Sequence, residues 1–241
     1  MKKNLICILL SLYVLCLGKV AFGSTYQIGD LLCGPEANVC VNPHWAWGMV
    51  LYVDPKPSAS GYKGIAMMLE DRTDDVAWAV DPFIQENLIG ADHYNIYGGK
   101  ANQRTYCRHT DSDCKATFSP PSTSAFNACT TYKGGHFKDW YLPSLFEAML
   151  MFNVAQQMTY GADAKRPYEC PSPYTDCAPH FFVNLQLQNY WSSTEGYGFG
   201  ANAPTPGANA ALFMDLADGF ESGGNAKNTI STVRCVRAIP E

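Results

Sequence analysis

The sequence predicts one α+β domain, with strands at both ends of the chain and two helices between them. Residues 47–54 and 231–238 are short apolar segments bounded by turn-forming residues, which is typical of strands. The segment that follows Pro143 instead repeats its apolar residues at helical spacing. Strands, then helices, then strands indicate an α+β arrangement whose two ends lie close together.

Residues 1–23 have the pattern of a secretory signal peptide. After two early lysines, residues 5–17 are largely apolar, and residues 21–23 form a small-x-small cleavage site. The apolar run is shorter than the roughly 18 to 20 residues of a membrane span. Leu15 precedes Cys16, where lipidation needs a small residue. We therefore expect a Sec-type export signal and a protein that is secreted or displayed on the cell surface, without a membrane span.

The exported chain is acidic. Without the three lysines of the signal segment, Lys and Arg fall from 17 to 14 against 22 Asp and Glu, a formal charge of −8. Nucleic acids and sulfated polysaccharides are bound through clusters of Lys and Arg, so we expect no nucleic-acid partner. The remaining length suits one domain with its own core. We assign residues 24–43 to a polar lead-in and residues 44–241 to that domain.

Eight cysteines remain after the signal segment, and six of them form three pairs with six residues between the members. Turn-forming residues within each pair would bring the sulfurs within bridging distance. A bridge between the other two would join the last strand to the middle of the chain. Eight cysteines allow about a hundred pairings, and zinc is the competing interpretation, although C-x2-C spacing is missing and export favours disulfides. The expected pairs are Cys33–Cys40, Cys107–Cys114, Cys170–Cys177 and Cys129–Cys235.

Strands are expected wherever short apolar segments lie between turn-forming residues. The first two make a hairpin around a Pro- and Gly-rich turn, and the last two are separated by a glycine turn at residues 219–224. The segments from 104 to 123 and from 161 to 179 look like surface insertions, and residues 85–101 have no clear period. The expected strands span residues 47–54, 62–70, 76–80, 189–194, 208–216 and 231–238.

Two helices are expected in the middle of the chain. Residues 124–132 form the first, which two glycines end. The second runs from 145 to about 158, and its start is well defined because Ser144 and Glu147 have the S-x-x-E spacing of a capping box. Pro143 favours an extended residue before the cap and fixes where this helix begins.

Four sequence blocks together resemble the bacterial DUF1566 family, the module that also forms the C-terminal domain of the Legionella collagen-like adhesin. The resemblance covers roughly residues 44–239. The blocks are residues 47–54 (WGMVLYVD), 139–144 (DWYLPS) with Glu147, 190–195 (YWSSTE) and 233–237 (VRCVR).

This resemblance implies a C-type-lectin-like fold that is related to the formylglycine-generating enzyme. Such a fold has a small twisted antiparallel sheet, two flanking helices, adjacent termini and long loops that present the binding face. A Cys129–Cys235 bridge would tie the first helix to the closing strand of this fold. The three C-x6-C loops depart from the family, so a family member's ligand does not transfer directly.

Most of the conspicuous residues are expected to be structural. Large indoles in the recurrent blocks favour a role in the core, and we expect this of Trp47, Trp140 and Trp191. We expect Asp139 to accept backbone or indole hydrogen bonds, and Arg234 and Arg237 to pair with carboxylates.

No catalytic residue is predicted. The cysteines pair off, the five histidines lack metal-binding or protease spacing, and Ser192-Ser193 lie outside a G-x-S-x-G motif. No cofactor is expected either. An acidic loop with Asp71, Asp74 and Asp75 offers oxygen ligands for calcium, although a solvated turn is the simpler interpretation. The EPN and WND motifs of calcium-dependent lectins are missing.

The loop from Glu195 to Asn209 is the predicted binding element. It combines Gly and Asn with aromatic residues, a composition typical of binding loops, although a merely mobile loop is an equal alternative. Trp78, Tyr94 and Tyr97 would extend the same face. The ligand-binding candidates are Tyr197, Phe199, Asn202, Asn209, Glu195 and Trp78.

The sequence thus predicts an adhesin-like binding protein that recognises a host or environmental protein or glycan. One alternative is a secreted enzyme on a formylglycine-generating-enzyme-like scaffold, with a pocket that joins His136, Asp139 and Glu195. The other is a structural, homo-oligomeric subunit of a surface assembly.

Overall fold

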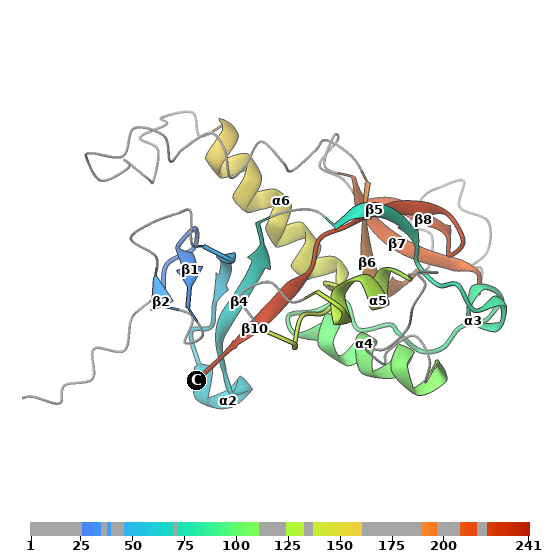
Figure 1. Cartoon of the computed structure of the whole chain (residues 1–241), viewed down its shortest axis with the longest axis horizontal. Coiled ribbons are helices and arrows are strands. Elements are labelled where there is room, and N and C mark those ends of the chain that lie inside the picture. The colour runs from blue at the N-terminus through green and yellow to red at the C-terminus, as the bar shows by residue number, and fades with distance from the viewer. Residues whose placement is uncertain are drawn as a thin grey trace, which may run out of the picture.

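Two β-sheets and a few helices make up the described part of the chain (Figure 1). This computed structural model describes residues 26–34, 38–39, 46–69, 72–110, 124–132, 137–160, 189–196, 208–215 and 221–241. The α+β class is confirmed. The expected single small sheet is wrong, because the strands divide between two five-stranded sheets. The expected signal segment and the bridge Cys170–Cys177 lie outside the described residues.

The first sheet has the strand order β10-β4-β3-β1-β2, and all of its neighbours are antiparallel. Its centre is the predicted hairpin, with a short helix, α2 (Pro57–Ser60), in the turn. The first two strands come from the expected lead-in, which therefore belongs to the sheet. The strands are β1 (Leu31–Cys33), β2 (Asn38–Val39), β3 (Gly48–Val53), β4 (Tyr62–Met68) and β10 (Val236–Pro240).

The second sheet has the order β5-β9-β6-β7-β8, and only the β6–β9 pair among these is parallel. Its edge strand β8 occupies the segment that we expected to be a glycine turn. The Gly-rich sequence has a low intrinsic strand preference, but pairing with β7 overrides it. The strands are β5 (Arg72–Ala77), β6 (Asn189–Glu195), β7 (Ala210–Asp215), β8 (Glu221–Ala226) and β9 (Ile230–Val233).

The expected last strand is divided between the two sheets. The chain leaves β9 at Val233, passes through Arg234 and Cys235, and enters β10 in the other sheet (Figure 1). Cys235 is bonded to Cys129, and their Cα atoms lie 5.4 Å apart, which confirms this predicted bridge. The disulfide therefore anchors the point at which the chain crosses from one sheet to the other.

Two further cysteines, Cys33 and Cys107, are also disulfide-bonded. Their expected partners, Cys40 and Cys114, lie outside the described residues.

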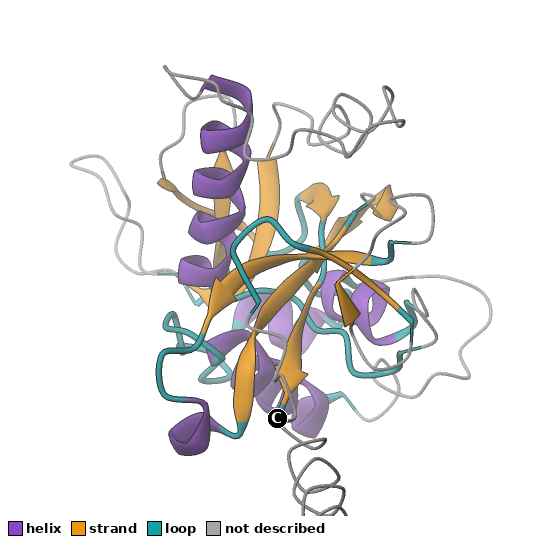
Figure 2. Cartoon of the chain, turned by 90° about the vertical axis from the view of Figure 1, so that its left-hand side faces the viewer, coloured by secondary structure: helices purple, strands orange, loops and turns teal. Residues whose placement is uncertain are grey.

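Both expected helices are present, as α5 (Ala125–Thr130) and α6 (Leu145–Tyr160). The sequence did not predict α4 (Gly98–His109), part of which we assigned to a surface insertion, or the short α3 (Pro82–Glu86). The buried side of α4 includes Asn102 and Gln103, so it lacks the apolar repeat by which a helix is recognised. Helices lie on more than one side of the strands (Figure 2).

The indoles lie in the core, as predicted. Trp47, Trp140 and Trp191 are 7%, 2% and 0% exposed. Trp78, which we expected on a binding face, is also completely buried and packs edge-on against Phe126. This apolar core fixes the positions of the strands and helices that carry the polar clusters.

Candidate functional site

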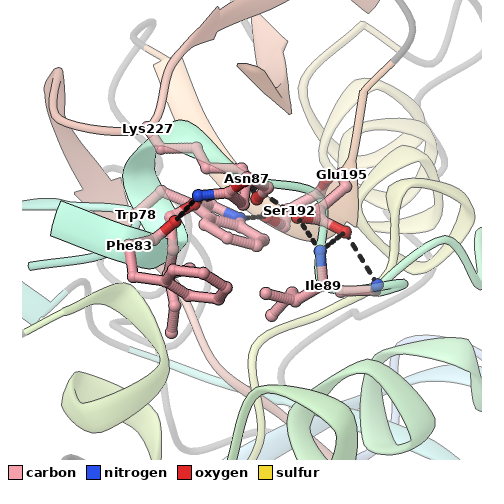
Figure 3. Close-up of polar contacts among 9 residues, drawn as sticks. Trp78, Phe83, Asn87, Ile89, Ser192, Glu195 and Lys227 are labelled. Atoms are coloured by element: carbon pink, nitrogen blue, oxygen red, sulfur yellow. Dashed lines mark hydrogen bonds and ion pairs between the residues drawn. The ribbon is translucent and has the colours of Figure 1, made fainter. Parts of the chain in front are cut away.

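Glu195, at the end of β6, is held by an internal polar cluster (Figure 3). Its carboxylate accepts hydrogen bonds from the backbone N–H groups of Ile89 and Ala91, at 2.9 to 3.0 Å. The ammonium of Lys227 lies 2.5 Å from Glu195 Oε1, and the two side chains are 0% and 2% exposed. The hydrogen bonds of the Glu195 side chain therefore link the segment around residue 90 to the second sheet.

Lys227 follows β8 and reaches into the same cluster (Figure 3). Its Nζ donates to the backbone oxygens of Ile84 and Asn87, at 2.9 and 2.7 Å, as well as to Glu195. It also lies 5.0 Å from the ring centre of Trp78. Burial lowers the pKa of the Lys227 amine, while Glu195 opposes that change.

Trp78 is fixed by the indole N–H, which donates to the backbone oxygen of Ser192 at 2.8 Å. Neither Trp78 nor Glu195 therefore reaches the surface on which we expected them to meet a ligand.

A second buried carboxylate, Glu147, lies where two helices begin. The predicted capping box is confirmed: Ser144 N donates to Glu147 Oε2 at 2.7 Å, and Glu147 N donates to Ser144 Oγ at 3.3 Å. The same carboxylate accepts from Tyr97 N and Gly99 N at the start of α4, and from the Tyr141 hydroxyl at 3.1 Å. One side chain thus caps both α6 and α4.

Burial governs the ionisation of Glu147. It raises the pKa of this carboxyl group from 4.5 to about 7, although the hydrogen bonds from Ser144, Tyr141 and Gly99 favour the charged form. Burial and the neighbouring Glu147 carboxylate raise the pKa of Tyr141. Within the described part of the chain, no Lys, Arg or His forms an ion pair with Glu147.

The tyrosine face is a partly exposed cluster made of Tyr52, Asp54, Tyr62, Tyr97 and Lys100. The ring centres of Tyr62 and Tyr52 lie 5.0 and 6.4 Å from that of Tyr97. The Lys100 ammonium donates to the Tyr62 hydroxyl at 2.8 Å, and the Tyr97 hydroxyl donates to Asp54 Oδ2 at 3.1 Å. This face joins the turn end of the β3–β4 hairpin to the start of α4.

The groups of the tyrosine face have altered acidities. Burial raises the pKa of Tyr97 and of Tyr52, and hydrogen bonds from Ser60 and Lys56 lower the pKa of Asp54. Tyr97 also has a φ of 60°, the left-handed region that residues other than glycine seldom adopt. Altered acidities and unusual backbone conformations both concentrate at functional sites.

Only the two ends of the predicted binding loop lie within the described residues. Tyr197, Phe199 and Asn202 lie outside the described residues, whereas Asn209 is exposed and its backbone oxygen accepts from Lys227 N at 2.8 Å. Tyr94 is 67% exposed.

The residues of the alternative catalytic pocket are not brought together as far as the structure describes them. Asp139 Oδ1 accepts from Arg237 Nε at 2.6 Å, which confirms a carboxylate partner for Arg237 and corrects the backbone or indole partner expected for Asp139. Glu195 forms an ion pair with Lys227 instead, and His136 lies outside the described residues. The Arg234 guanidinium donates to the backbone oxygen of Leu69 at 3.2 Å.

The calcium candidates are only partly described. Asp75 accepts from the Thr232 hydroxyl at 3.0 Å, and nothing is described of Asp71 or of the Asp74 side chain. Among the described residues, no three His, Cys, Asp or Glu side chains group as metal ligands would. In the same part of the chain, no helix has the length and apolar character needed to cross a bilayer.

Sequence reasoning missed Lys227, Lys100, Tyr52 and Tyr62. A partial signal for the two tyrosines existed, because the predicted hairpin puts both on neighbouring strands close to the same turn, with Tyr52 opposite Ile65. No local signal links Lys227 to Glu195, which lies 32 residues earlier.

No family model matches the chain, and no curated protein matches it. The DUF1566 resemblance therefore stays a prediction.

Proposed function

We propose that this protein is an exported bacterial recognition protein that binds a host or environmental protein or glycan without catalysing a reaction. The observation that carries the proposal is the tyrosine face. Three partly exposed tyrosine rings lie together beside a lysine and an aspartate. Tyrosine offers a rigid apolar surface with a polar end, and such side chains are enriched in binding surfaces.

The tyrosine face has unused hydrogen-bond donors. Within the described part of the chain, the Tyr52 hydroxyl has no hydrogen-bond partner, and Lys100 uses one of its three donors, on Tyr62. The oxygens of Asp54 already accept from the Lys56 N–H and from the hydroxyls of Ser60 and Tyr97. A ligand of this face would therefore supply acceptor oxygens.

The buried carboxylates favour binding over catalysis. Glu147 has a pKa of about 7, which would suit a general base. Its side chain is nevertheless buried, and its oxygens are occupied by four donors from two helix starts and Tyr141. A substrate would have to displace helix caps to reach it.

The proposed scaffold is a C-type-lectin-like member of the DUF1566 family that a signal peptide directs out of the cell. The four sequence blocks, the α+β architecture and the Cys129–Cys235 disulfide support it. The loop from Glu195 to Asn209 remains a further predicted binding element.

A glycan and host-protein array, probed with the folded exported chain with and without EDTA, tests the function. We expect saturable binding that EDTA does not change. Replacing Tyr62 by Ala should then weaken binding on the order of tenfold, as removal of a central aromatic contact does.

The matched control is Phe83→Ala, which removes an exposed aromatic ring from α3, outside the tyrosine face. Binding that both substitutions reduce equally, or that only the control reduces, would contradict the assignment of the tyrosine face. A folded protein that binds nothing on either array would contradict the function itself.

A further inference from the structure

The buried Lys227–Glu195 ion pair also holds an amine directly against a carboxyl group. The amine nitrogen lies 2.5 Å from a carboxyl oxygen, and both side chains are removed from solvent (Figure 3). Two groups held in this way have an effective concentration far above that of free reactants, on the order of 10⁵–10⁸ M for well-oriented pairs.

Two backbone carbonyls fix the direction of the amine. Ile84 O and Asn87 O accept from Lys227 Nζ at 2.9 and 2.7 Å. A neutral amine has two N–H bonds and one lone pair. When the two N–H bonds point to these carbonyls, the lone pair is left to face the third contact, which is Glu195. That contact is Glu195 Oε1, so the lone pair has to turn from this oxygen to the adjoining carboxyl carbon before it can attack.

Two backbone amides face the carboxyl group from the other side. Ile89 N lies 3.0 Å from each Glu195 oxygen, and Ala91 N lies 2.9 Å from Oε2. Donors at this distance stabilise the negative charge that develops on a carboxyl oxygen when a nucleophile adds to the carbon. The Ile89 and Ala91 amides would thus hold Oε2 while it carries this charge.

The surroundings also favour the neutral form of the amine. Burial disfavours charged groups, and it lowers the pKa of the Lys227 amine. Transfer of one proton from Nζ to Glu195 Oε1 converts the ion pair into a neutral amine and a carboxylic acid, without a second base.

We propose that Lys227 and Glu195 condense into an intramolecular amide in the folded chain. After the first proton moves to Oε1, the nitrogen lone pair forms a bond to the carboxyl carbon. Oε2, which the Ile89 and Ala91 amides hold, takes the negative charge and becomes the amide oxygen. A second nitrogen proton moves to Oε1, the bond from carbon to Oε1 breaks, and water leaves. Atoms and charges balance without an oxidant, a reductant or a cofactor.

The product is a covalent tie within the second sheet. It joins the end of β6 to the turn between β8 and β9, across 32 residues of sequence. The exclusion of solvent that favours condensation also protects the amide from hydrolysis.

Mass spectrometry of the intact exported chain tests this proposal. We expect a mass lower by one water than that of the sequence corrected for its disulfides, and a branched peptide that joins Lys227 to Glu195 after digestion. A full mass with no branched peptide, measured on the folded protein, would overturn the proposal.

Substitutions identify the lysine whose reaction causes the loss of one water from the mass. Lys227→Arg retains a cation but replaces the amine by a guanidinium, which is a poor nucleophile, so the full mass should return. Lys138→Arg, at an exposed lysine, should keep the loss. A water loss that persists in Lys227→Arg would place the reaction elsewhere and refute the assignment. The wild-type measurement decides the question even if Lys227→Arg fails to fold.

Discussion

Glu147 and Glu195 are both carboxylates that the fold buries, but their partners differ in kind. Glu147 is surrounded by backbone N–H groups and a tyrosine hydroxyl, whereas Glu195 faces an amine. Neutral donors leave the first carboxylate free to gain a proton as the pH falls. The amine makes the second one a charge pair and the precursor of an amide. Burial of the same residue type therefore gives a carboxyl group that gains or loses a proton near neutral pH at position 147. At position 195 it gives an ion pair that links two segments of the chain.

Removal of the Lys227 amine should have the largest effect on stability. Lys227→Met leaves Glu195 buried without its cation and prevents the amide, so we expect the free energy of unfolding to fall by about 3–5 kcal/mol. Chemical denaturation measures it.

The matched control is Lys138→Met at an exposed position, which should change the stability little. The double variant Glu195→Gln/Lys227→Met should recover part of the loss, because the buried charge is then gone. Equal losses in Lys227→Met and the control would show that the cluster does not fasten the sheet.

The pH dependence of stability should come next in size and should arise at Glu147. The folded protein binds this proton more tightly than the unfolded chain, since the pKa rises from 4.5 to about 7. The stabilisation is therefore complete below about pH 4.5 and is lost as the pH rises through 7, by on the order of 3 kcal/mol. Urea denaturation across this pH range measures it.

Glu147→Gln should remove that part of the pH dependence and lower the stability at acidic pH, because one amide oxygen cannot satisfy the four donors. Glu86→Gln, at an exposed position of α3, is the control and should keep the wild-type profile. A Glu147→Gln profile parallel to the wild type would assign the titration to another group.

Ser144→Ala should have a smaller effect. It removes the hydroxyl that accepts from Glu147 N and donates to Asn95 O at 2.8 Å, but it leaves the Glu147 carboxylate in place. Loss of such a cap costs about 1 kcal/mol. Thermal unfolding measures this loss of stability. A loss as large as that of Lys227→Met would mean that the Ser144 hydroxyl, and not the Glu147 carboxylate, holds the starts of α4 and α6 together.

Tyr62→Phe should have the smallest effect on stability. It removes the hydroxyl that accepts from Lys100 at a partly exposed position, and surface changes of this kind usually stay within about 0.5 kcal/mol. Stability should be unchanged while ligand binding weakens. This result would distinguish the tyrosine face, which serves binding, from the buried clusters of Glu147 and Glu195, which serve stability.

The sequence predicted the features that depend on neighbouring residues. The capping box of Ser144 and Glu147 is a local spacing, and it is present as expected. The helices α5 and α6 and the β3–β4 hairpin were also predictable in this way. The Cys129–Cys235 bridge is not local, and it was predicted because these two cysteines remain after the three C-x6-C pairs.

The missed features depend on tertiary contacts. Helix α4 buries amide side chains, of which Asn102 donates to His93 O and to Ser193 Oγ, so its pattern is not that of an apolar face. Likewise, nothing near Glu147 in the sequence shows that it also caps α4, because Tyr97 and Gly99 lie about 50 residues away. The Lys227–Glu195 contact requires the topology of the second sheet to be known.

The last two strands of the chain complete the two sheets: β9 lies between β5 and β6 in the second sheet, and β10 pairs with β4 at the edge of the first. Each sheet therefore lacks one strand until the last residues of the chain have been synthesised. Pairings between such distant segments form slowly, so the incomplete chain has no finished sheet in which to become trapped. In the export that we propose, completion of both sheets would wait until the last residues of the chain have crossed the membrane.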